Sequence, residues 1–385
     1  MKVNELINLL IAEVEASNYS GWDIFDGLNS KLFQKTPLYH SRIARLLWIQ
    51  LFKISPINFR FLTMVPKGYN AKGLALLIRG YINMYKIFNK SEYLHKAYHL
   101  ADIIISQRSK SRSYFCVGYN FHWEAKAFSV LPFTPNMIVS SFVAQAFLDL
   151  YEIDNKSCWL NYSLGIAHFI EKELLLDRRD NEICFGYIPD EPARVHNVNL
   201  MGSRLMARLF SITKKEEFRS YAKRAVNYSC NFQKQDGSWD YGEMAHHKWV
   251  DNFHTGFNLV AINEVQNFIN TKKWMGNLKI GLDFHLKYHF QKDMTPKYFE
   301  NKIYPIDIHN FSQGLETLFI FGYLDKAMLL LEKCIELMFD RNKHYFYYQQ
   351  NKYFTNKNNY IRWGQSWMFY ALSLLITTDK NNDLK

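Results

Sequence analysis

An internal repeat constrains the fold of this chain more than any other feature of its sequence. Six times, a polar segment is followed by a small residue and then by an apolar run long enough for a helix. Neighbouring small residues are separated by between 52 residues (314 to 366) and 68 residues (73 to 141). The six positions are Gly73, Ser141, Gly202, Gly256, Gly314 and Ser366. This spacing accommodates two helices and two connections, so each repeat predicts a helical hairpin.

The segments between these runs have the pattern of a second, amphipathic helix. In the range 157–175, apolar residues recur every three or four positions and so form one face of a helix. The same pattern occurs in the ranges 91–107, 215–232, 274–290 and 324–339, and we assign the range 38–52 as the first helix of this set. The runs after the small residues are apolar nearly all round, as expected of helices buried between neighbours.

Six outer and six inner helices predict an all-α fold, the (α/α)6 toroid, in which six helical hairpins form two concentric rings. A helical solenoid has a similar repeat, but six units favour closure because closure removes the exposed ends. We expect one domain over residues 1–385, with the N-terminal segment 1–38 packed on or near the central cleft. Strand signals in the ranges 182–189 and 343–354 predict short strands or loops over one face of the ring.

The net charge and the cysteine content restrict which binding partners and which cellular compartment are expected. The net charge of +11 is spread out, without a run of five or six basic residues, which argues against nucleic acid. A diffuse positive field would help an anionic substrate to approach, and a basic surface that serves only solubility is the equal alternative. The five cysteines show no close metal-ligand spacing, so we expect reduced thiols, no metal and no other cofactor. Because no stretch of eighteen clean apolar residues occurs, we expect no transmembrane segment and a cytoplasmic location, with peripheral association at the inner membrane left open.

Polar residues stand around each small residue, where the inner helices should begin. Helix N-termini carry unpaired N–H groups that favour anions, and in a ring these ends converge on one face. Capping explains asparagine and aspartate at such positions but does not explain histidine or arginine. We therefore predict a polar cleft at this face, with these substrate-binding residues: Asn136, Asn197, Asn199, His309, Gln313, Arg362 and Trp363.

The densest group of reactive side chains lies between residues 240 and 254. A loop that brings acids, a phenol and imidazoles to the start of an inner helix can carry out proton transfer. We predict Asp240, Tyr241, Asp251 and His254 as the catalytic residues. The adjacent pair His246–His247 is a weaker candidate for a metal site, because adjacent histidines on a loop are more often exposed.

Two motifs outside the repeats add candidate substrate contacts. Trp22, Asp23 and Asp26 lie in a segment that could fold back across the cleft, although a capped turn with a buried tryptophan is the alternative interpretation. His122, Trp123 and Glu124 add an aromatic platform and a carboxylate to the rim of the same cleft, in the loop before the second inner helix.

Two short patterns resemble those of known toroidal proteins. Residues Gln233, Asp236, Gly237, Ser238 and Trp239 resemble the Gln–x–x–Asp–Gly–Ser–Trp turn of (α/α)-toroid enzymes, which include polysaccharide lyases and terpene cyclases. We include Trp239 among the substrate-binding candidates.

The stretches 21–23, 237–239 and 251–257 together resemble toroidal proteins of bacterial capsule, exopolysaccharide and O-antigen biosynthesis, which are related in fold to glycoside hydrolases, polysaccharide lyases and uronyl epimerases. This resemblance implies an anionic oligo- or polysaccharide as partner, with other polysaccharide-synthesis proteins as further partners.

Several functions remain open at this point. A hydrolase needs two carboxylates around the bond, which Asp251 could provide together with Asp240, Glu243, Glu124 or Asp23. A uronate lyase or C5-epimerase needs a base, a proton donor and a group that neutralises the carboxylate; the candidates are Asn199, Tyr241, His254 and Arg362. A non-catalytic glycan-binding scaffold would keep the cleft without needing the catalytic groups. A terpene cyclase is disfavoured because neither Asp–x–Asp–Asp nor Asp–Asp–x–x–Asp occurs.

Overall fold

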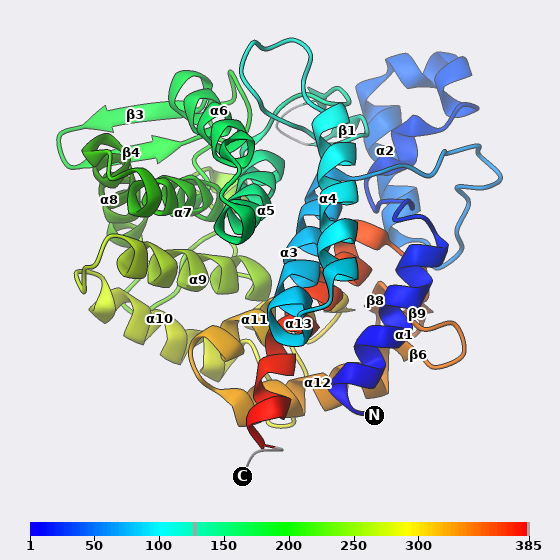
Figure 1. Cartoon of the computed structure of the whole chain (residues 1–385). Coiled ribbons are helices and arrows are strands. Elements are labelled where there is room, and N and C mark those ends of the chain that lie inside the picture. Colours follow the sequence, from blue (N-terminus) through cyan, green and yellow to red (C-terminus); the bar gives the residue numbers. More distant parts are fainter. Residues whose placement is uncertain (126–128, 383–385) are drawn as a thin grey trace.

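A computed structural model describes residues 1–125 and 129–382 (Figure 1). Residues 126–128 and 383–385 lie outside this description, and with them the end of the expected domain 1–385. Six helices form the inner ring: α3 (Ala71–Phe88), α5 (Met137–Asp154), α7 (His196–Thr213), α9 (Asn252–Phe268), α11 (Ile308–Ile320) and α13 (Ser366–Asn382). Each packs on the next, and α13 packs on α3, so the ring closes. This closure confirms the predicted (α/α)6 toroid.

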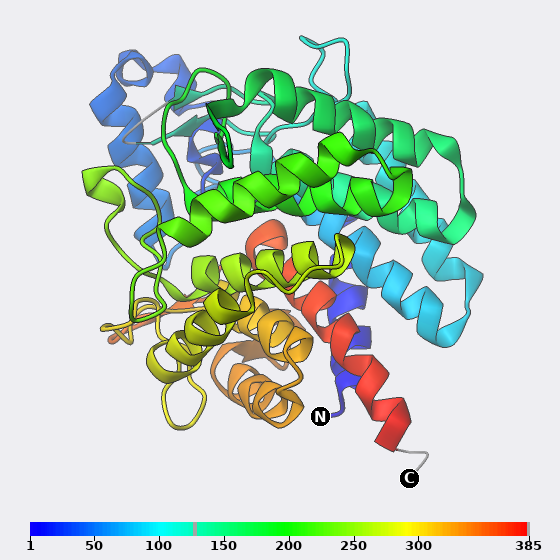
Figure 2. The same ribbon diagram turned by 90° about the vertical axis from the view of Figure 1, so that its left-hand side faces the viewer.

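A second set of helices lies outside this ring (Figures 1 and 2). It consists of α1 (Val3–Ala16), α4 (Ser91–Ser106), α6 (Ser157–Glu173), α8 (Glu216–Asn231), α10 (Met275–Tyr288) and α12 (Leu324–Met338). Five of these helices coincide with the predicted amphipathic segments. Their apolar faces are buried against the inner ring, as Trp159, Ile166 and Ile170 of α6 illustrate.

The first outer helix was predicted in the wrong place. The range 38–52 forms much of α2 (Arg42–Ile54), which stands apart from the ring at the upper right of Figure 1. The outer position belongs instead to α1, which packs on α13 and buries Leu6, Ile7 and Leu10 completely. The glutamates that interrupt its apolar pattern accept hydrogen bonds at the edge of this packing, Glu15 from Tyr81 (2.7 Å) and Glu13 from Asn359 (3.2 Å).

The two faces of the toroid differ in their connections. Three hairpins turn through only two residues (89–90, 155–156 and 214–215). The first residue of each turn, Asn89, Asn155 or Lys214, adopts a left-handed conformation with φ between 53° and 59°, which ends the preceding helix. The opposite face carries the long connections 17–70, 107–136, 174–195, 232–251, 289–307 and 339–365.

The short strands all lie in these long connections, and all pair antiparallel. The pairs are β1 (Trp123–Glu124) with β2 (Ser129–Val130), β3 (Leu175–Arg179) with β4 (Glu182–Phe185), and β6 (Phe339–Asp340) with β7 (Tyr345–Phe346). A three-stranded sheet has the order β5 (Ile306–Asp307), β8 (Gln349–Gln350) and β9 (Thr355–Asn356). Strands therefore occur in both predicted ranges, on the face where the inner helices begin.

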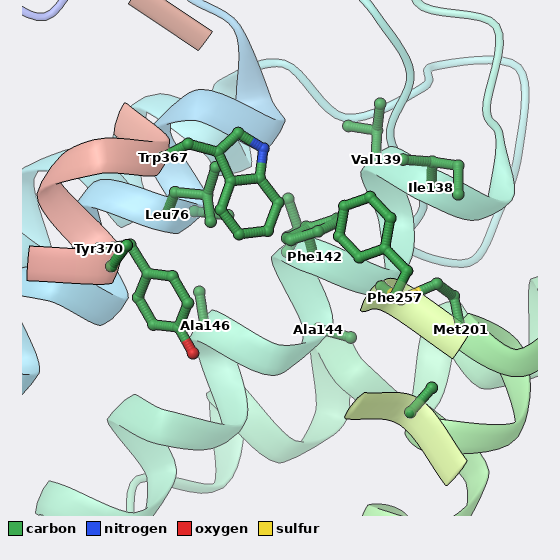
Figure 3. Packing of buried hydrophobic residues seen from close by; sticks show 14 of the residues in the cluster. Leu76, Ile138, Val139, Phe142, Ala144, Ala146, Met201, Phe257, Trp367 and Tyr370 are labelled. Carbon is green, nitrogen blue, oxygen red and sulfur yellow. The ribbon is translucent and has the colours of Figure 1, made fainter. Parts of the chain in front are cut away.

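The centre of the ring is filled in layers. Below the N-terminal ends of the inner helices lies an apolar layer that includes Leu76, Phe142, Phe257 and Trp367 (Figure 3). Further along the same helices lies an ionic layer in which buried arginines meet carboxylates. Arg208 of α7 contacts Asp149 (2.6 Å) and Glu152 (2.7 Å) of α5, Arg79 of α3 contacts Asp149 (2.9 Å), and Arg204 contacts Glu264 (2.6 Å).

Candidate active site

A cavity of about 460 Å³ opens on the face where the inner helices begin. Its size lies within the range of small-molecule sites. Every inner helix, or the turn directly before it, contributes to the wall: Lys72 of α3, Phe142 of α5, Asn197 and Met201 of α7, His254 of α9, His309 of α11, and Arg362 of the π-turn Ile361–Gln365 before α13. The ring thus brings residues that are far apart in the sequence to one hollow.

Eight of the predicted site residues line this cavity: Trp123, Asn197, Tyr241, Asp251, His254, His309, Arg362 and Trp363. Three of these eight come from the predicted catalytic group, and the fourth member of that group, Asp240, does not join them. The carboxylate of Asp240 instead contacts Lys234 (2.6 Å) and Lys248 (3.4 Å) in its own loop. The two lysines hold this acid outside the cavity wall.

Four predicted substrate-binding residues have structural partners instead of a place on the cavity wall. Asn136 caps α5 by accepting the Val139 N–H (2.9 Å). The Asn199 side chain is fully buried, where it accepts the Phe185 N–H (3.0 Å) and donates to the carbonyl of Ala225 (2.8 Å). The Trp239 indole donates to the carbonyl of Ser229 (3.0 Å), and Gln313 donates to Thr317 within α11 (3.3 Å). In all four residues the polar group forms hydrogen bonds within the protein, at a helix end, within a helix or between neighbouring segments.

The N-terminal candidates also lie behind the cavity wall. The Trp22 indole donates to the carbonyl of Val65 (2.9 Å), and the Asp26 carboxylate pairs with Arg60 (2.6 Å). Asp23 binds Arg362 through two hydrogen bonds (2.5 and 2.7 Å) and so positions a residue that does line the cavity. From this segment, the cavity wall receives Ile24 and Phe25.

His122 and Glu124 support the rim from behind. The His122 ring contacts Tyr39 (2.9 Å) and Ser129 (2.9 Å). Glu124 is buried and pairs with Arg45 (2.7 Å) and Arg42 (3.2 Å) of α2. Trp123 is the residue of this motif that lines the cavity. The ion pairs of Glu124 connect α2 to the rim from the side that faces away from the cavity.

An aspartate–histidine pair forms at the start of α9. Asp251 is the N-cap residue: its carboxylate accepts the His254 N–H (3.1 Å) and also contacts Nδ1 of the His254 ring (2.8 Å). The Asp251 side chain is almost fully buried, whereas that of His254 is 20% exposed, toward the cavity. Because Asp251 holds Nδ1, Nε2 is the nitrogen that is left for a bound molecule.

His309 of α11 presents a second imidazole to the same cavity. Its Nδ1 lies 3.3 Å from the carbonyl oxygen of Trp363, an acceptor, so Nδ1 carries the proton in the neutral ring and Nε2 is the basic nitrogen. Burial, reinforced by the nearby Lys72, holds the pKa of His309 well below its usual range. The ring stacks on Trp363 with 4.3 Å between centroids. His309 is therefore an uncharged base at neutral pH.

The two imidazoles share two phenyl neighbours. The Phe253 centroid lies 4.2 Å from that of His254 and 4.8 Å from that of His309. Phe257 contacts both rings as well, at 6.2 and 5.9 Å. These apolar rings fix the two histidines around one small volume and exclude water from the space between them.

Lys72 places an amine at the floor of the cavity, where none of the described residues forms an ion pair with it. Its Nζ lies over the rings of Phe142 (4.5 Å), Trp367 (5.4 Å) and Phe257 (5.7 Å), three side chains that Figure 3 shows converging from α5, α13 and α9. No hydrogen bond or ion pair holds the amine within the part of the chain that the structure describes. Burial, with a further contribution from Arg362, lowers the pKa of Lys72 well below its usual value. A buried, unpaired amine is well suited to bind an anionic group.

Tyr241 is the phenol of the site. It stacks on Trp249 at 4.3 Å and lies 4.7 Å from the His254 ring, centroid to centroid. Burial, followed by the charge of Asp251, raises the pKa of Tyr241, so the hydroxyl keeps its proton and acts as a hydrogen-bond donor.

Sequence reasoning missed most of the aromatic wall. These residues line the cavity from the long connections: Phe25, Tyr187, Trp249, Tyr298, Phe299 and Tyr348. They have no periodic pattern, and the only sequence signal was the high aromatic content of 17%. Lys53 of α2 also reaches the wall and was not predicted.

The histidine pair His246–His247 lies at the cavity wall, with ring centroids 4.2 Å apart. Within residues 1–125 and 129–382, no group of three or more histidine, cysteine, aspartate or glutamate side chains is placed to hold a metal ion.

Solved structures with a similar fold include sugar-processing enzymes. A cellobiose 2-epimerase from Bacillus thermoamylovorans matches with a TM-score of 0.64 and 12% identity over 81% of this chain and 88% of that chain. An unsaturated glucuronyl hydrolase specific for heparin matches with a TM-score of 0.59 and 9% identity, over 80% of this chain and 86% of its own.

A polysaccharide lyase matches with a TM-score of 0.57 and 12% identity, over 80% of this chain and 90% of its own. No protein-family model and no curated protein sequence matches the chain. At these identities the structural matches establish the toroid and leave the reaction open.

Proposed function

We propose that this protein is a carbohydrate-active enzyme that moves a proton at a carbon atom of an anionic, uronate-type sugar, as an epimerase or a lyase. One observation carries the proposal: two imidazoles, those of His254 and His309, face one cavity around shared phenyl rings. An acid and a base on the two sides of a sugar carbon are what proton exchange at that carbon requires.

The carboxylates of the site favour this chemistry over hydrolysis. A glycosidase uses two carboxyl groups on either side of the scissile bond. Within the described residues, Asp251 is the only acid on the cavity wall, and His254 already occupies it. Asp307 is fully buried, where it accepts hydrogen bonds from Trp363 (2.9 Å), Gln349 (2.5 Å) and the His309 N–H (2.8 Å). Neither acid is free to protonate a glycosidic oxygen.

The positive groups define the kind of sugar. Among the described residues Lys72 has no ion-pair partner, and Arg362 is oriented by Asp23 beside the ring of Tyr119 (5.1 Å). A uronate carboxylate at these two groups would supply the missing negative charge and regain for Lys72 the protonated state that burial disfavours. A neutral sugar would leave the amine in its cage of aromatic rings without a partner.

The reaction then follows from the states of the two histidines. His309 Nε2 takes the proton from the carbon beside the carboxylate, and the C–H electron pair moves into that carboxylate, where Lys72 and Arg362 stabilise the added charge. For epimerisation, a His254 ring that carries a proton on each nitrogen shares one with Asp251 and returns the other to the opposite face of the carbon. For elimination, the neighbouring C–O bond breaks instead, and Tyr241 protonates the leaving oxygen.

We place the substrate in a bacterial surface polysaccharide, as the resemblance of residues 21–23, 237–239 and 251–257 implies. The aromatic cavity with Lys72 and Arg362 on its wall, the net charge of +11 and the sugar-processing enzymes of similar fold support that assignment.

The test is incubation of the protein in deuterated water with oligosaccharides that contain glucuronate or galacturonate. For an epimerase we expect deuterium at C5 of an inverted product by nuclear magnetic resonance. For a lyase we expect the ultraviolet absorbance of an unsaturated uronate, which carries no hydrogen at C5. His254→Gln and His309→Gln should abolish the reaction, whereas His95→Gln, the same change on the exposed side of α4, should preserve it. New reducing ends with neither deuterium at C5 nor ultraviolet absorbance would establish hydrolysis instead. Tight glycan binding without any reaction would establish a non-catalytic scaffold.

A further inference from the structure

A run of exposed apolar side chains lies on α2 and the turn that follows it. On α2, Ile43 (71% exposed), Leu47 (66%), Leu51 (48%) and Ile54 (62%) repeat at helical spacing along one face. The next turn continues the area with Ile57 (62%), Phe61 (79%) and Leu62 (68%). We refer to these seven residues as the α2 surface. Exposed aliphatic and aromatic side chains in this number mark an interaction site.

The opposite face of α2 is firmly packed, so the exposure is not due to a loose helix. Trp48 stacks on Phe33 with 4.4 Å between centroids, and its indole donates to the carbonyl of Gly27 (2.9 Å). Ile49 and Phe52 are buried, and Arg45 pairs with Glu124 (2.7 Å). The fold therefore holds the α2 surface outward in a fixed orientation.

The charges around the α2 surface identify its partner. Between residues 31 and 67 the chain contains no aspartate or glutamate, while seven basic residues occur there: Lys31, Lys35, Arg42, Arg45, Lys53, Arg60 and Lys67. Arg42, Arg45 and Arg60 pair with acids, whereas Lys31, Lys35 and Lys67 are exposed. Lys31 lies beside the exposed turn, since its N–H donates to the carbonyl of Met64 (3.3 Å). An apolar stripe in a segment that carries basic residues and no acidic ones matches the interface of an anionic bilayer.

We propose that the α2 surface docks this protein on an anionic membrane. The apolar side chains enter the interface, and the exposed lysines face the lipid phosphates. None of the described helices has the length and hydropathy to cross a bilayer, so the attachment is peripheral. Because Lys53 on the inner side of α2 lines the cavity, a docked molecule holds its cavity close to the membrane surface. The inference is independent of the proposed reaction.

The test uses the full chain and lipid vesicles in a sedimentation assay. Vesicles that contain phosphatidylglycerol should bind the protein, and pure phosphatidylcholine vesicles should bind it much less. The triple variant Ile43→Ser, Leu47→Ser and Phe61→Ser should weaken binding at least about tenfold, because each change removes apolar area from the interface. The double variant Lys31→Glu and Lys35→Glu should weaken binding and reduce its dependence on salt.

A matched control carries three exposed apolar residues to serine elsewhere: Met275→Ser and Ile280→Ser on α10, with Leu329→Ser on α12. This variant should bind vesicles as the unchanged protein does. Equal thermal unfolding midpoints for the variants exclude a folding effect. Equal vesicle binding by the α2 triple variant, or no binding by the unchanged protein, would overturn the proposal. So would a dimer in light scattering that the α2 changes dissociate, since the surface would then join two copies of this chain.

Discussion

The two ends of the inner ring are built from the same six helices, yet their buried ionisable groups differ. At the end with two-residue turns, Arg79, Arg204 and Arg208 meet carboxylates on neighbouring helices at hydrogen-bond distance. At the other end Arg362 pairs with Asp23, but Lys72 lies among aromatic rings with no ion pair among the described residues, and His309 is buried and uncharged. Paired charges specify how helices pack, whereas unpaired buried groups destabilise the fold unless a ligand completes them. The contrast therefore separates an end where buried ion pairs hold the helices together from an end where buried groups are available to a ligand.

The most direct test of this contrast is to remove an imidazole at the end with the long connections, where the cavity lies. We expect His254→Gln to reduce turnover about 1,000-fold, because it removes a proton donor, while the free energy of unfolding stays within about 1 kcal/mol. Single-turnover kinetics and urea unfolding measure the two quantities. A loss of turnover that parallels a loss of stability would show that His254 is only a packing residue.

The corresponding substitution at the end with two-residue turns should change the free energy of unfolding. Asp149→Ala leaves Arg79 and Arg208 without their shared carboxylate and should lower the free energy of unfolding by about 3 kcal/mol. Although burial raises it, the two arginines lower the pKa of Asp149 to about 2. The stabilisation is thus complete above the ordinary pKa near 4 and is lost as the pH falls toward 2.

Urea unfolding at pH 7 and at pH 3 checks this expectation. The exposed pair of Arg219 with Glu216 serves as a control, since Glu216→Ala should have an effect below about 0.5 kcal/mol. An equally small effect of Asp149→Ala would remove the distinction between the two ends.

Lys72→Met sharpens the comparison in the other direction. Methionine has a similar shape and no amine to desolvate, so we expect the protein to become more stable by about 1 kcal/mol while KM for a uronate substrate rises. Thermal unfolding and steady-state kinetics measure the two effects. Lys172→Met, on the exposed side of α6, should change neither. A destabilised Lys72→Met protein with unchanged KM would show that Lys72 stabilises the fold and does not bind the substrate.

The smallest effect is a linked proton. Burial depresses the pKa of Lys72 in the free protein, and a bound carboxylate raises that pKa again. Between the two pKa values the complex holds more protons than the free protein, so uronate binding should take up a fraction of a proton and weaken as the pH rises. Isothermal titration in two buffers of different ionisation enthalpy measures this uptake, which Lys72→Met should abolish. Proton release on binding would contradict the role of Lys72.

The repeat was sufficient to predict the ring, because hairpin length and helical periodicity are local properties of the sequence. The error over α2 has a local cause as well: its helical pattern is genuine, but one apolar face packs through Ile49 and Phe52 away from the ring and the other remains exposed. Within the site, the expectation that polar residues gather where inner helices begin located Asp251, His254, His309 and Arg362.

Periodicity could not distinguish a polar group that lines the cavity from one that forms hydrogen bonds within the protein. Asn136 and Asn199 stand at equivalent positions to those residues but bond to backbone groups. That assignment depends on which loops cover each helix end, and loop conformation has no periodic signal.

The pair formed by Asp23 and Arg362 joins positions 339 residues apart. During synthesis on the ribosome, the aspartate leaves the exit tunnel long before its partner exists, and the intervening hairpins must first close around the ring. Completion of the anion site is therefore a late event in the life of each molecule. A nascent or truncated chain that lacks the arginine can form many of its helices yet has no completed anion site, so unfinished copies would not compete for substrate.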